Sequence, residues 1–170
     1  MPRAIAALVV ALGTLGTLAA PAAAQERPAP AIEFAAGGLF FPDDDGPTVR
    51  NGMIGGNGRF YVSPRVSVGP EVAYVPGENY HALMLTGNVT IDLTAPDARV
   101  TPFVVGGAGI FRSTQAFVNT PPFSHTEGAF TAGGGVRARL GDHVIVGAEA
   151  RVGWELHLRA NGFVGVRLGK

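Results

Sequence analysis

The chain has 170 residues, of which 46% are hydrophobic and 15% charged, and this composition excludes an intrinsically disordered protein, which needs low hydrophobicity and high net charge. Its 25 Gly and 13 Pro residues disfavour a helical protein, because each weakens or breaks a helix by about 1 to 3 kcal/mol. The 13 basic and 13 acidic residues balance and form no basic block, so nothing predicts nucleic-acid binding. The lack of Cys excludes disulfides and thiolate chemistry.

The N-terminal segment has the pattern of a secretory signal peptide. One positive residue, Arg3, precedes an apolar run, and small residues follow as far as Ala24. A membrane-anchoring helix is the alternative, but Gly and Thr residues dilute the run below the roughly 20 strongly apolar residues that a span needs. We therefore expect residues 1–24 to be a signal peptide, 25–31 to be a short N-terminal lead, and 32–170 to form one domain.

The rest of the chain alternates between apolar and polar residues in eight short segments, separated by turn residues. These segments span residues 32–41, 51–62, 66–75, 82–93, 99–112, 128–140, 143–155 and 161–169. A period of two predicts β-strands. The connections 63–65, 95–98 and 141–142 are short enough for antiparallel hairpins, so we expect them at one end of a sheet and the longer connections at the other. The longest connection is 113–127.

The seventh segment shows the division of faces most clearly, with Val144 and Val152 on one side and Glu149 and Arg151 on the other. The fifth segment is apolar on both sides, and its orientation stays open. Such alternation fits a soluble barrel with its apolar face inward or a membrane barrel with its apolar face toward lipid. The polar faces carry Arg, and the only Lys is the last residue, which favours enclosed pairing with carboxylates over solvation.

Aromatic residues also gather toward the strand ends, as in the interfacial girdles of membrane barrels. Phe40, Tyr74 and Trp154 belong to one end, and Phe34 and Phe60 to the other. Together with the Arg-rich polar faces, this distribution predicts a membrane barrel. Pro70, which has no N–H to donate within a strand, predicts a local β-bulge.

Two phrases within the strands, VGPEV at 68–72 and TPFVVGGAG at 101–109, together with the signal peptide and the eight strands, carry a family resemblance. Residues 32–170 resemble the small eight-stranded outer-membrane barrels of Gram-negative bacteria, of the outer-membrane-protein-A and -X type. The resemblance implies an all-β, eight-stranded antiparallel up-and-down transmembrane β-barrel in the cell outer membrane, in a porin-like family, with 25–31 as a periplasmic lead. It implies a monomer that contacts outer-membrane lipid and lipopolysaccharide and that needs no cofactor.

In such a barrel, nine charged side chains would point inward as a lumen charge network. They are Glu33, Arg59, Glu71, Asp92, Arg137, Arg139, Glu149, Arg151 and Arg167. An eight-stranded barrel is only wide enough for side chains to fill, so this near balance of charge predicts a closed plug of ion pairs. A channel lined by these charges is the alternative.

No motif predicts a catalytic, cofactor or metal site. The four His residues lack paired metal spacing, and the acidic segment 43–46 lacks the Glu that a helix-loop-helix calcium site requires, so we interpret that segment as a surface loop. The nearest enzymatic candidate combines Ser124, His125 and Glu127, since some eight-stranded outer-membrane enzymes are lipid A deacylases. Adjacent residues in an extended chain point to opposite faces, however, which separates Ser124 from His125.

The sequence therefore predicts a non-enzymatic outer-membrane barrel whose surface loops bind an external ligand or protein. The candidate contact loop is 113–127, with the exposed residues Phe117, Pro121, Pro122, Phe123 and His125, because apolar side chains between prolines often mark a contact surface. The alternatives are a secreted, soluble, lipocalin-like barrel that binds a small apolar ligand and, as a lesser one, an outer-membrane enzyme that modifies lipid A.

Overall fold

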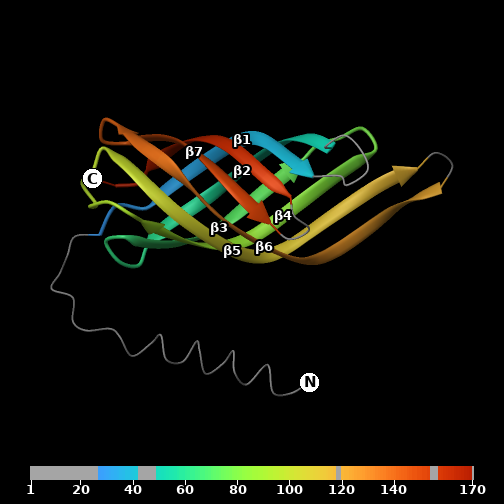
Figure 1. The fold of residues 1–170 in the computed structure, drawn as a ribbon, viewed down its shortest axis with the longest axis horizontal. Helices are drawn as coiled ribbons and strands as arrows, with labels where there is room; N and C mark the ends of the chain where they lie inside the picture. Colours follow the sequence, from blue (N-terminus) through green and yellow to red (C-terminus); the bar gives the residue numbers. More distant parts are fainter. Residues whose placement is uncertain (1–26, 42–48, 118–119, 154–156, 170) are drawn as a thin grey trace, which may run out of the picture.

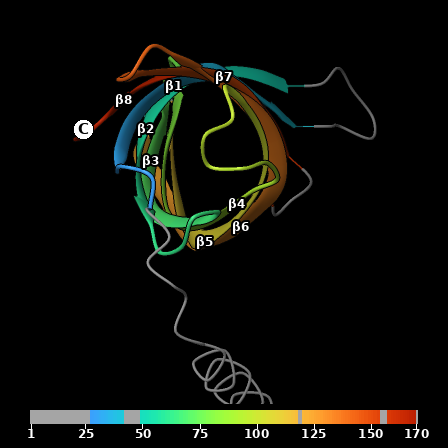
Figure 2. The ribbon, with the colours of Figure 1, turned by 90° about the vertical axis from the view of Figure 1, so that its left-hand side faces the viewer.

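The fold is a closed barrel of eight antiparallel strands (Figure 1). The computed structural model describes residues 27–41, 49–117, 120–153 and 157–169. The strands are β1 (Ala31–Phe41), β2 (Val49–Tyr61), β3 (Val66–Val75), β4 (Tyr80–Asp92), β5 (Val100–Phe117), β6 (Thr120–Leu140), β7 (Val144–Gly153) and β8 (Leu158–Arg167). Each strand pairs with its neighbours in the chain, and β1 also pairs with β8, which closes the ring seen in Figure 2. The predicted all-β, eight-stranded up-and-down architecture is confirmed.

Three sequence-based expectations fall outside the described residues. They concern the signal peptide at 1–24, the acidic segment 43–46 and the aromatic residue Trp154. Within the described part of the chain, no helix is long and apolar enough to cross a membrane.

The three connections expected as hairpins lie together at one end of the barrel, which we call the short-turn end, although 93–99 is longer than 76–79 at the opposite end. They are residues 62–65, 93–99 and 141–143, and Gly141 adopts a positive φ of 73° that favours glycine. The chain before β1 and the chain after β8 meet at this end, where the Leu168 amide donates to the Pro30 carbonyl at 2.6 Å. Figure 1 shows the described N-terminal lead and the C-terminus on this same side.

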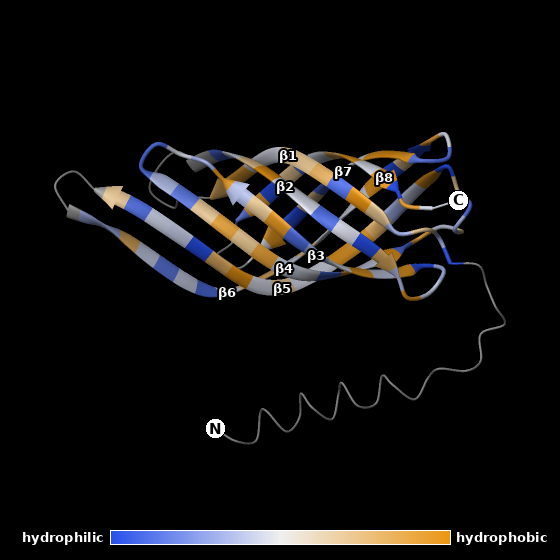
Figure 3. Cartoon of the chain, turned by 180° about the vertical axis from the view of Figure 1, so that it is seen from behind, coloured by the Kyte–Doolittle hydropathy of each residue, from blue (hydrophilic) through white to orange (hydrophobic). Residues whose placement is uncertain are grey.

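Hydrophilic and hydrophobic residues alternate along the strands (Figure 3). The exposed large side chains are mostly apolar, whereas charged and amide side chains are buried inside, as the alternation predicts. The structure shows the orientation of β5, which the sequence left open. Phe103 and Val105 face inward and are 2% and 5% exposed, whereas Val104 and Ile110 face outward and are 42% and 49% exposed. Phe34, for example, is a large apolar side chain on the outer surface and is 68% exposed. This arrangement inverts that of a water-soluble barrel, whose apolar side chains lie inside.

Apolar side chains also fill two parts of the interior. Toward the end opposite the short turns, which we call the long-loop end, one cluster consists of Leu39, Met53, Ala73, Val75, Ala82 and Met84. A second cluster, nearer the short-turn end, consists of Ala31, Phe103, Val105, Ile145 and Phe163. The interior is therefore packed with side chains of both kinds.

The expected loop at 113–127 is wrong, because most of it continues β5 and β6. Gln115 pairs with Phe123 and Phe117 pairs with Thr120, with a register irregularity between Gln115 and Phe117. β6 pairs with β7 only from Thr131 onward, so the hairpin extends beyond the other strands at the long-loop end (Figure 1). Proline is tolerated at the edge of a sheet, which explains why two consecutive prolines do not interrupt β6.

The bulge expected near Pro70 is also absent. Asn57 on β2 pairs with Glu71 on β3, and Phe60 pairs with Val68. The two pairs are three residues apart on both strands, so no extra residue is inserted on either side of Pro70. A Cβ atom at Gly69 would lie 1.7 Å from the Gly58 carbonyl oxygen. The two strands therefore accommodate proline through a close backbone approach that glycine permits, without inserting a residue.

Candidate functional site

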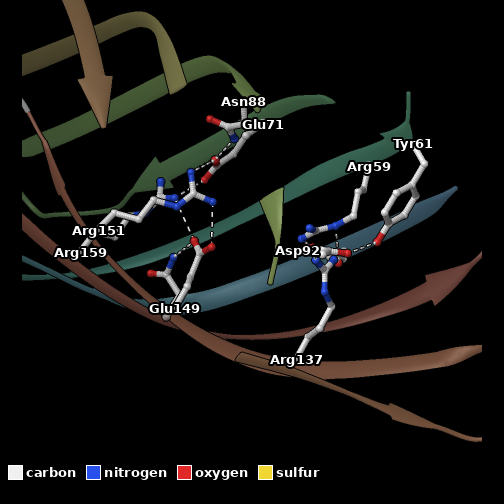
Figure 4. Close-up of polar contacts among 11 residues, drawn as sticks. Arg59, Tyr61, Glu71, Asn88, Asp92, Arg137, Glu149, Arg151 and Arg159 are labelled. Carbon is white, nitrogen blue, oxygen red and sulfur yellow. Dashed lines mark hydrogen bonds and ion pairs between the residues drawn. The ribbon is translucent and has the colours of Figure 1, made fainter. Parts of the chain in front are cut away.

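The interior holds a cluster of two arginines and two glutamates, seen in Figure 4. Arg151 donates through Nη1 to Glu71 Oε2 at 2.9 Å and through Nη2 to Glu149 Oε2 at 2.8 Å. Arg159 Nη2 lies 2.6 Å from Glu71 Oε1 and 3.1 Å from Glu149 Oε1. All four side chains are 7% exposed or less. Each carboxylate thus contacts both guanidiniums, and the four charges balance.

Two amides complete this four-residue charge cluster. Asn88 Nδ2 donates to Glu71 Oε2, and Asn161 Nδ2 donates to Glu149 Oε1 at 3.1 Å. Since carboxylate oxygens accept several hydrogen bonds, the extra donors help to offset the cost of removing the charges from water.

These contacts cross the lumen. Glu71 is on β3 and Arg151 is on β7, and three strands lie between these two strands in either direction around the ring of eight. Arg159 on β8 also places Nη1 4.0 Å from the sulfur of Met84 on β4, the strand opposite it. Side chains from opposite walls therefore meet inside the barrel at this level.

A second group of charges lies nearer the short-turn end. Arg59 binds Glu33 through two hydrogen bonds of 2.9 and 3.2 Å, and Arg137 pairs with Asp92. The Tyr61 hydroxyl donates to Asp92 Oδ2 at 3.1 Å. Figure 4 shows this group separated from the first.

Phe103 contacts both arginines of this second group. Its ring centroid is 5.5 Å from Cζ of Arg59 and 4.9 Å from Cζ of Arg137, distances typical of cation–π contacts. The ring also approaches Phe163 on β8, with centroids 6.3 Å apart. Because Phe103 is on β5, aromatic and charged side chains together occupy the lumen at this level.

The structure brings seven of the nine residues of the expected network into carboxylate–guanidinium contacts. They are Glu33, Arg59, Glu71, Asp92, Arg137, Glu149 and Arg151. Arg139 and Arg167 do not join them: Arg139 donates to the Asp97 carbonyl, and Arg167 donates to the Asp142 carbonyl at 3.4 Å. Both are at the short-turn end, where the turns supply backbone acceptors.

Sequence reasoning missed Arg159, which is 1% exposed and contacts both glutamates of the charge cluster. The expected eighth strand began at 161, whereas β8 begins at Leu158. Extending the alternation backwards from Arg167 would have placed Arg159 on the inward face.

The five residues of the expected contact loop lie on the extended hairpin. Pro121, Pro122, Phe123 and His125 are exposed in β6, and Phe123 is 62% exposed, while Phe117 is in β5. His125 Nε2 is 3.8 Å from Glu127 Oε2. The Ser124 hydroxyl forms its hydrogen bond with the Thr114 hydroxyl, at 3.0 Å, and not with His125. The three residues of the enzymatic candidate are thus not assembled as a nucleophile with its base. No group of three or more metal-ligating side chains occurs among the described residues.

An apolar outer wall around a charged, packed interior defines a membrane-type β-barrel. The family model described as "Outer membrane protein beta-barrel domain" matches residues 8–166. The chain therefore belongs to the outer-membrane β-barrel family. No curated protein sequence matches it significantly.

Several solved structures share this fold at low sequence identity. Neisserial surface protein A has a TM-score of 0.70 at 10% identity, covering 82% of this chain and 97% of that one. The N-terminal barrel domain of Pseudomonas aeruginosa OprF has a TM-score of 0.58 at 14% identity, covering 81% and 97%. Ail of Yersinia pestis has a TM-score of 0.57 at 11% identity, covering 83% and 97%.

Proposed function

We propose that the protein is a non-enzymatic, monomeric outer-membrane barrel with a closed lumen, which serves a structural or interaction role. The contact that carries this proposal is the one between Arg151 and Glu71, which joins opposite strands across the barrel at 2.9 Å. An eight-stranded barrel leaves little room beyond its side chains. A bridge across its centre therefore obstructs any continuous aqueous path.

The apolar cluster at the long-loop end adds a second closure. Leu39 and Met84 are 0% and 2% exposed, and Phe41, Tyr80 and Phe111 pack against their cluster. Hydrophobic constrictions exclude water and ions from narrow pores. Ions entering from the outside would thus meet an apolar layer before they reached the charge cluster.

The hairpin of β5 and β6 is the proposed contact element. Residues 123–127 of β6 pair with β5 on one side and lie beyond the described pairing of β6 with β7, so their other backbone edge has no pairing among the described residues. Unpaired strand edges accept an extended segment of another chain by β-strand addition. Phe123 offers an exposed aromatic side chain on this edge strand. The proposed partner is an external protein that presents an extended segment. Another barrel of this fold, Ail of Yersinia pestis, has been crystallised with the heparin analogue sucrose octasulfate, which illustrates that such barrels bind external molecules.

A shortened hairpin tests this role. Replacing residues 114–124 with Asn-Gly joins the cross-strand neighbours Ser113 and His125 through a two-residue turn that suits a hairpin. The probe is immobilised, reduced and carboxymethylated casein, an unfolded polypeptide that offers extended segments. We expect the full chain in detergent to be retained and the shortened variant to be released, with both variants keeping the gel mobility of a folded barrel. Equal retention would contradict the contact role.

Cell fractionation separates the membrane barrel from the soluble alternative. The exported protein should be recovered with the outer membrane and should precipitate when detergent is removed, because its outer wall is apolar. A dispersed, detergent-free protein that takes up a small apolar ligand saturably would support the lipocalin-like alternative and overturn the proposal.

A further inference from the structure

Three arginines border an open cavity at the short-turn end. The cavity has a volume of about 240 Å³, and its lining includes Arg27, Arg139 and Arg167 together with Asp97, Pro28 and Pro96. Its walls come from the chain before β1, from the turn at 93–99 and from the last residues of β6 and β8. The lining thus carries three positive charges and one negative charge.

Backbone contacts hold two of these arginines in place. The Arg139 guanidinium donates to the Asp97 carbonyl, and its amide donates to the Arg99 carbonyl at 2.9 Å. Arg167 donates through its side chain to the Asp142 carbonyl at 3.4 Å and through its amide to the His143 carbonyl at 2.8 Å. The two cations are therefore anchored by the short turns.

The charges of Arg139 and Arg167 are not matched by carboxylates. Four arginines deeper in the barrel each pair with a carboxylate, but among the described residues no carboxylate oxygen lies within ion-pair distance of Arg139 or Arg167. A guanidinium has five N–H donors, and each of these two uses one of them on a carbonyl. Most of their donors remain available to a ligand.

Buried donor atoms without a partner occur just inside this cavity. A smaller cavity of about 30 Å³ shares Arg139 and Arg167 with the first and extends to Arg137. The Arg137 side chain is 5% exposed, yet its Nε and Nη1 atoms are buried without a hydrogen-bond partner in the protein. An unpaired buried donor is costly, so these atoms favour an acceptor at this mouth.

We propose that the short-turn mouth is a binding site for a phosphate-type oxyanion, held between Arg139 and Arg167, with Arg27 at its outer side. A phosphate group accepts paired hydrogen bonds from guanidiniums and has enough oxygen atoms to engage several arginines together. Its source is either free phosphate in the aqueous phase or the headgroup of a phospholipid. The lipid source rests on the proposed membrane function, because only a spanning barrel places this mouth beside a leaflet.

The test measures phosphate binding to the folded barrel in a maltoside detergent, which contains no phosphate. Inorganic phosphate is titrated at constant ionic strength while NMR follows the arginine side-chain N–H signals. In a parallel arm, native mass spectrometry measures retention of short-chain phosphatidylglycerol against a diacylglycerol of equal chain length. The double variant Arg139→Gln and Arg167→Gln is compared with Arg65→Gln plus Arg99→Gln, which removes two exposed charges at the same end.

We expect saturable binding that weakens about tenfold for each pocket arginine removed, as for the loss of a charge-assisted hydrogen bond, and that stays unchanged in the control. Arg139→Lys keeps the charge and should lose less than Arg139→Gln, and the gel mobility of each variant reports its folding. Saturation by inorganic phosphate identifies free phosphate as the source, whereas selective retention of phosphatidylglycerol alone identifies the lipid headgroup. No saturable binding in either arm, or equal losses in the pocket and control variants, would overturn the proposal. A failure of the proposed outer-membrane function would remove only the lipid arm.

Discussion

Arg151 is the residue whose loss should reveal the packed charge cluster most clearly. Its side chain is 4% exposed, and it contacts both Glu71 and Glu149. Arg151→Ala leaves two buried carboxylates with Arg159 as their one remaining cation partner among the described residues. Removing one member of a buried ion pair typically costs about 3 to 5 kcal/mol, because the charge left behind is neither solvated nor paired. We expect a value near 3 kcal/mol, since Arg159 still contacts both glutamates.

The assay is equilibrium unfolding in guanidinium, with the barrel reconstituted in lipid vesicles and followed by the fluorescence of its single Trp. With a slope of about 2 to 6 kcal/mol per molar of guanidinium, a loss of 3 kcal/mol lowers the midpoint by about 0.5 to 1.5 M. Arg65→Ala is the matched control, because Arg65 is exposed in a short turn. Exposed charges of this kind contribute about 0 to 1 kcal/mol.

A double variant separates charge from packing. If Glu71→Gln is added to Arg151→Ala, the second change removes a charge that the first has left without its partner. Contacting residues of this kind commonly show coupling energies of about 0.5 to 3 kcal/mol, so the double variant should be more stable than the sum of the single losses indicates. Equal midpoints for Arg151→Ala and Arg65→Ala, or strictly additive losses, would refute the buried network.

Three further predictions concern other parts of the chain. The intact mass of the exported protein should correspond to a chain that begins at Gln25, and retention of residues 1–24 would refute the signal peptide. Val164→Arg, near the middle of β8, should cost about 2 to 4 kcal/mol in vesicles, and Leu168→Arg, beyond its end, about 0 to 1 kcal/mol; equal costs would argue against a lipid-facing wall. Gly69→Ala should lower the unfolding midpoint because its Cβ would meet the neighbouring backbone, whereas Gly87→Ala, with no atom within 4 Å, should leave it unchanged.

Sequence alone was sufficient for the parts of this fold that follow a simple period. The side-chain alternation of a strand fixes which residues share a face, so the inward positions of Glu71 and Arg151 could be predicted without knowing their partners. Which carboxylate meets which guanidinium depends on the register and closure of the ring. The contact between β3 and β7 therefore could not be predicted from the chain alone.

The prediction failed in two places. The prolines at 121 and 122 predicted a loop, but they lie at a strand edge where the missing N–H is tolerated. The predicted eighth segment begins at 161, whereas β8 begins at Leu158. The position in the sheet outweighed a local preference in the first case, and the second error concealed Arg159.

The central claim is that side chains meeting across the barrel close its lumen, and ion conductance tests it directly. The purified full-length barrel is inserted into a planar lipid bilayer, insertion is confirmed by the folded gel mobility of the recovered protein, and current is recorded at fixed voltage in potassium chloride. Because Arg151 and Glu71 bridge opposite strands and an apolar cluster lies toward the long-loop end, we predict a current that stays at the level of the protein-free bilayer. Steady, stepwise ion-conducting channels from the intact protein would contradict it.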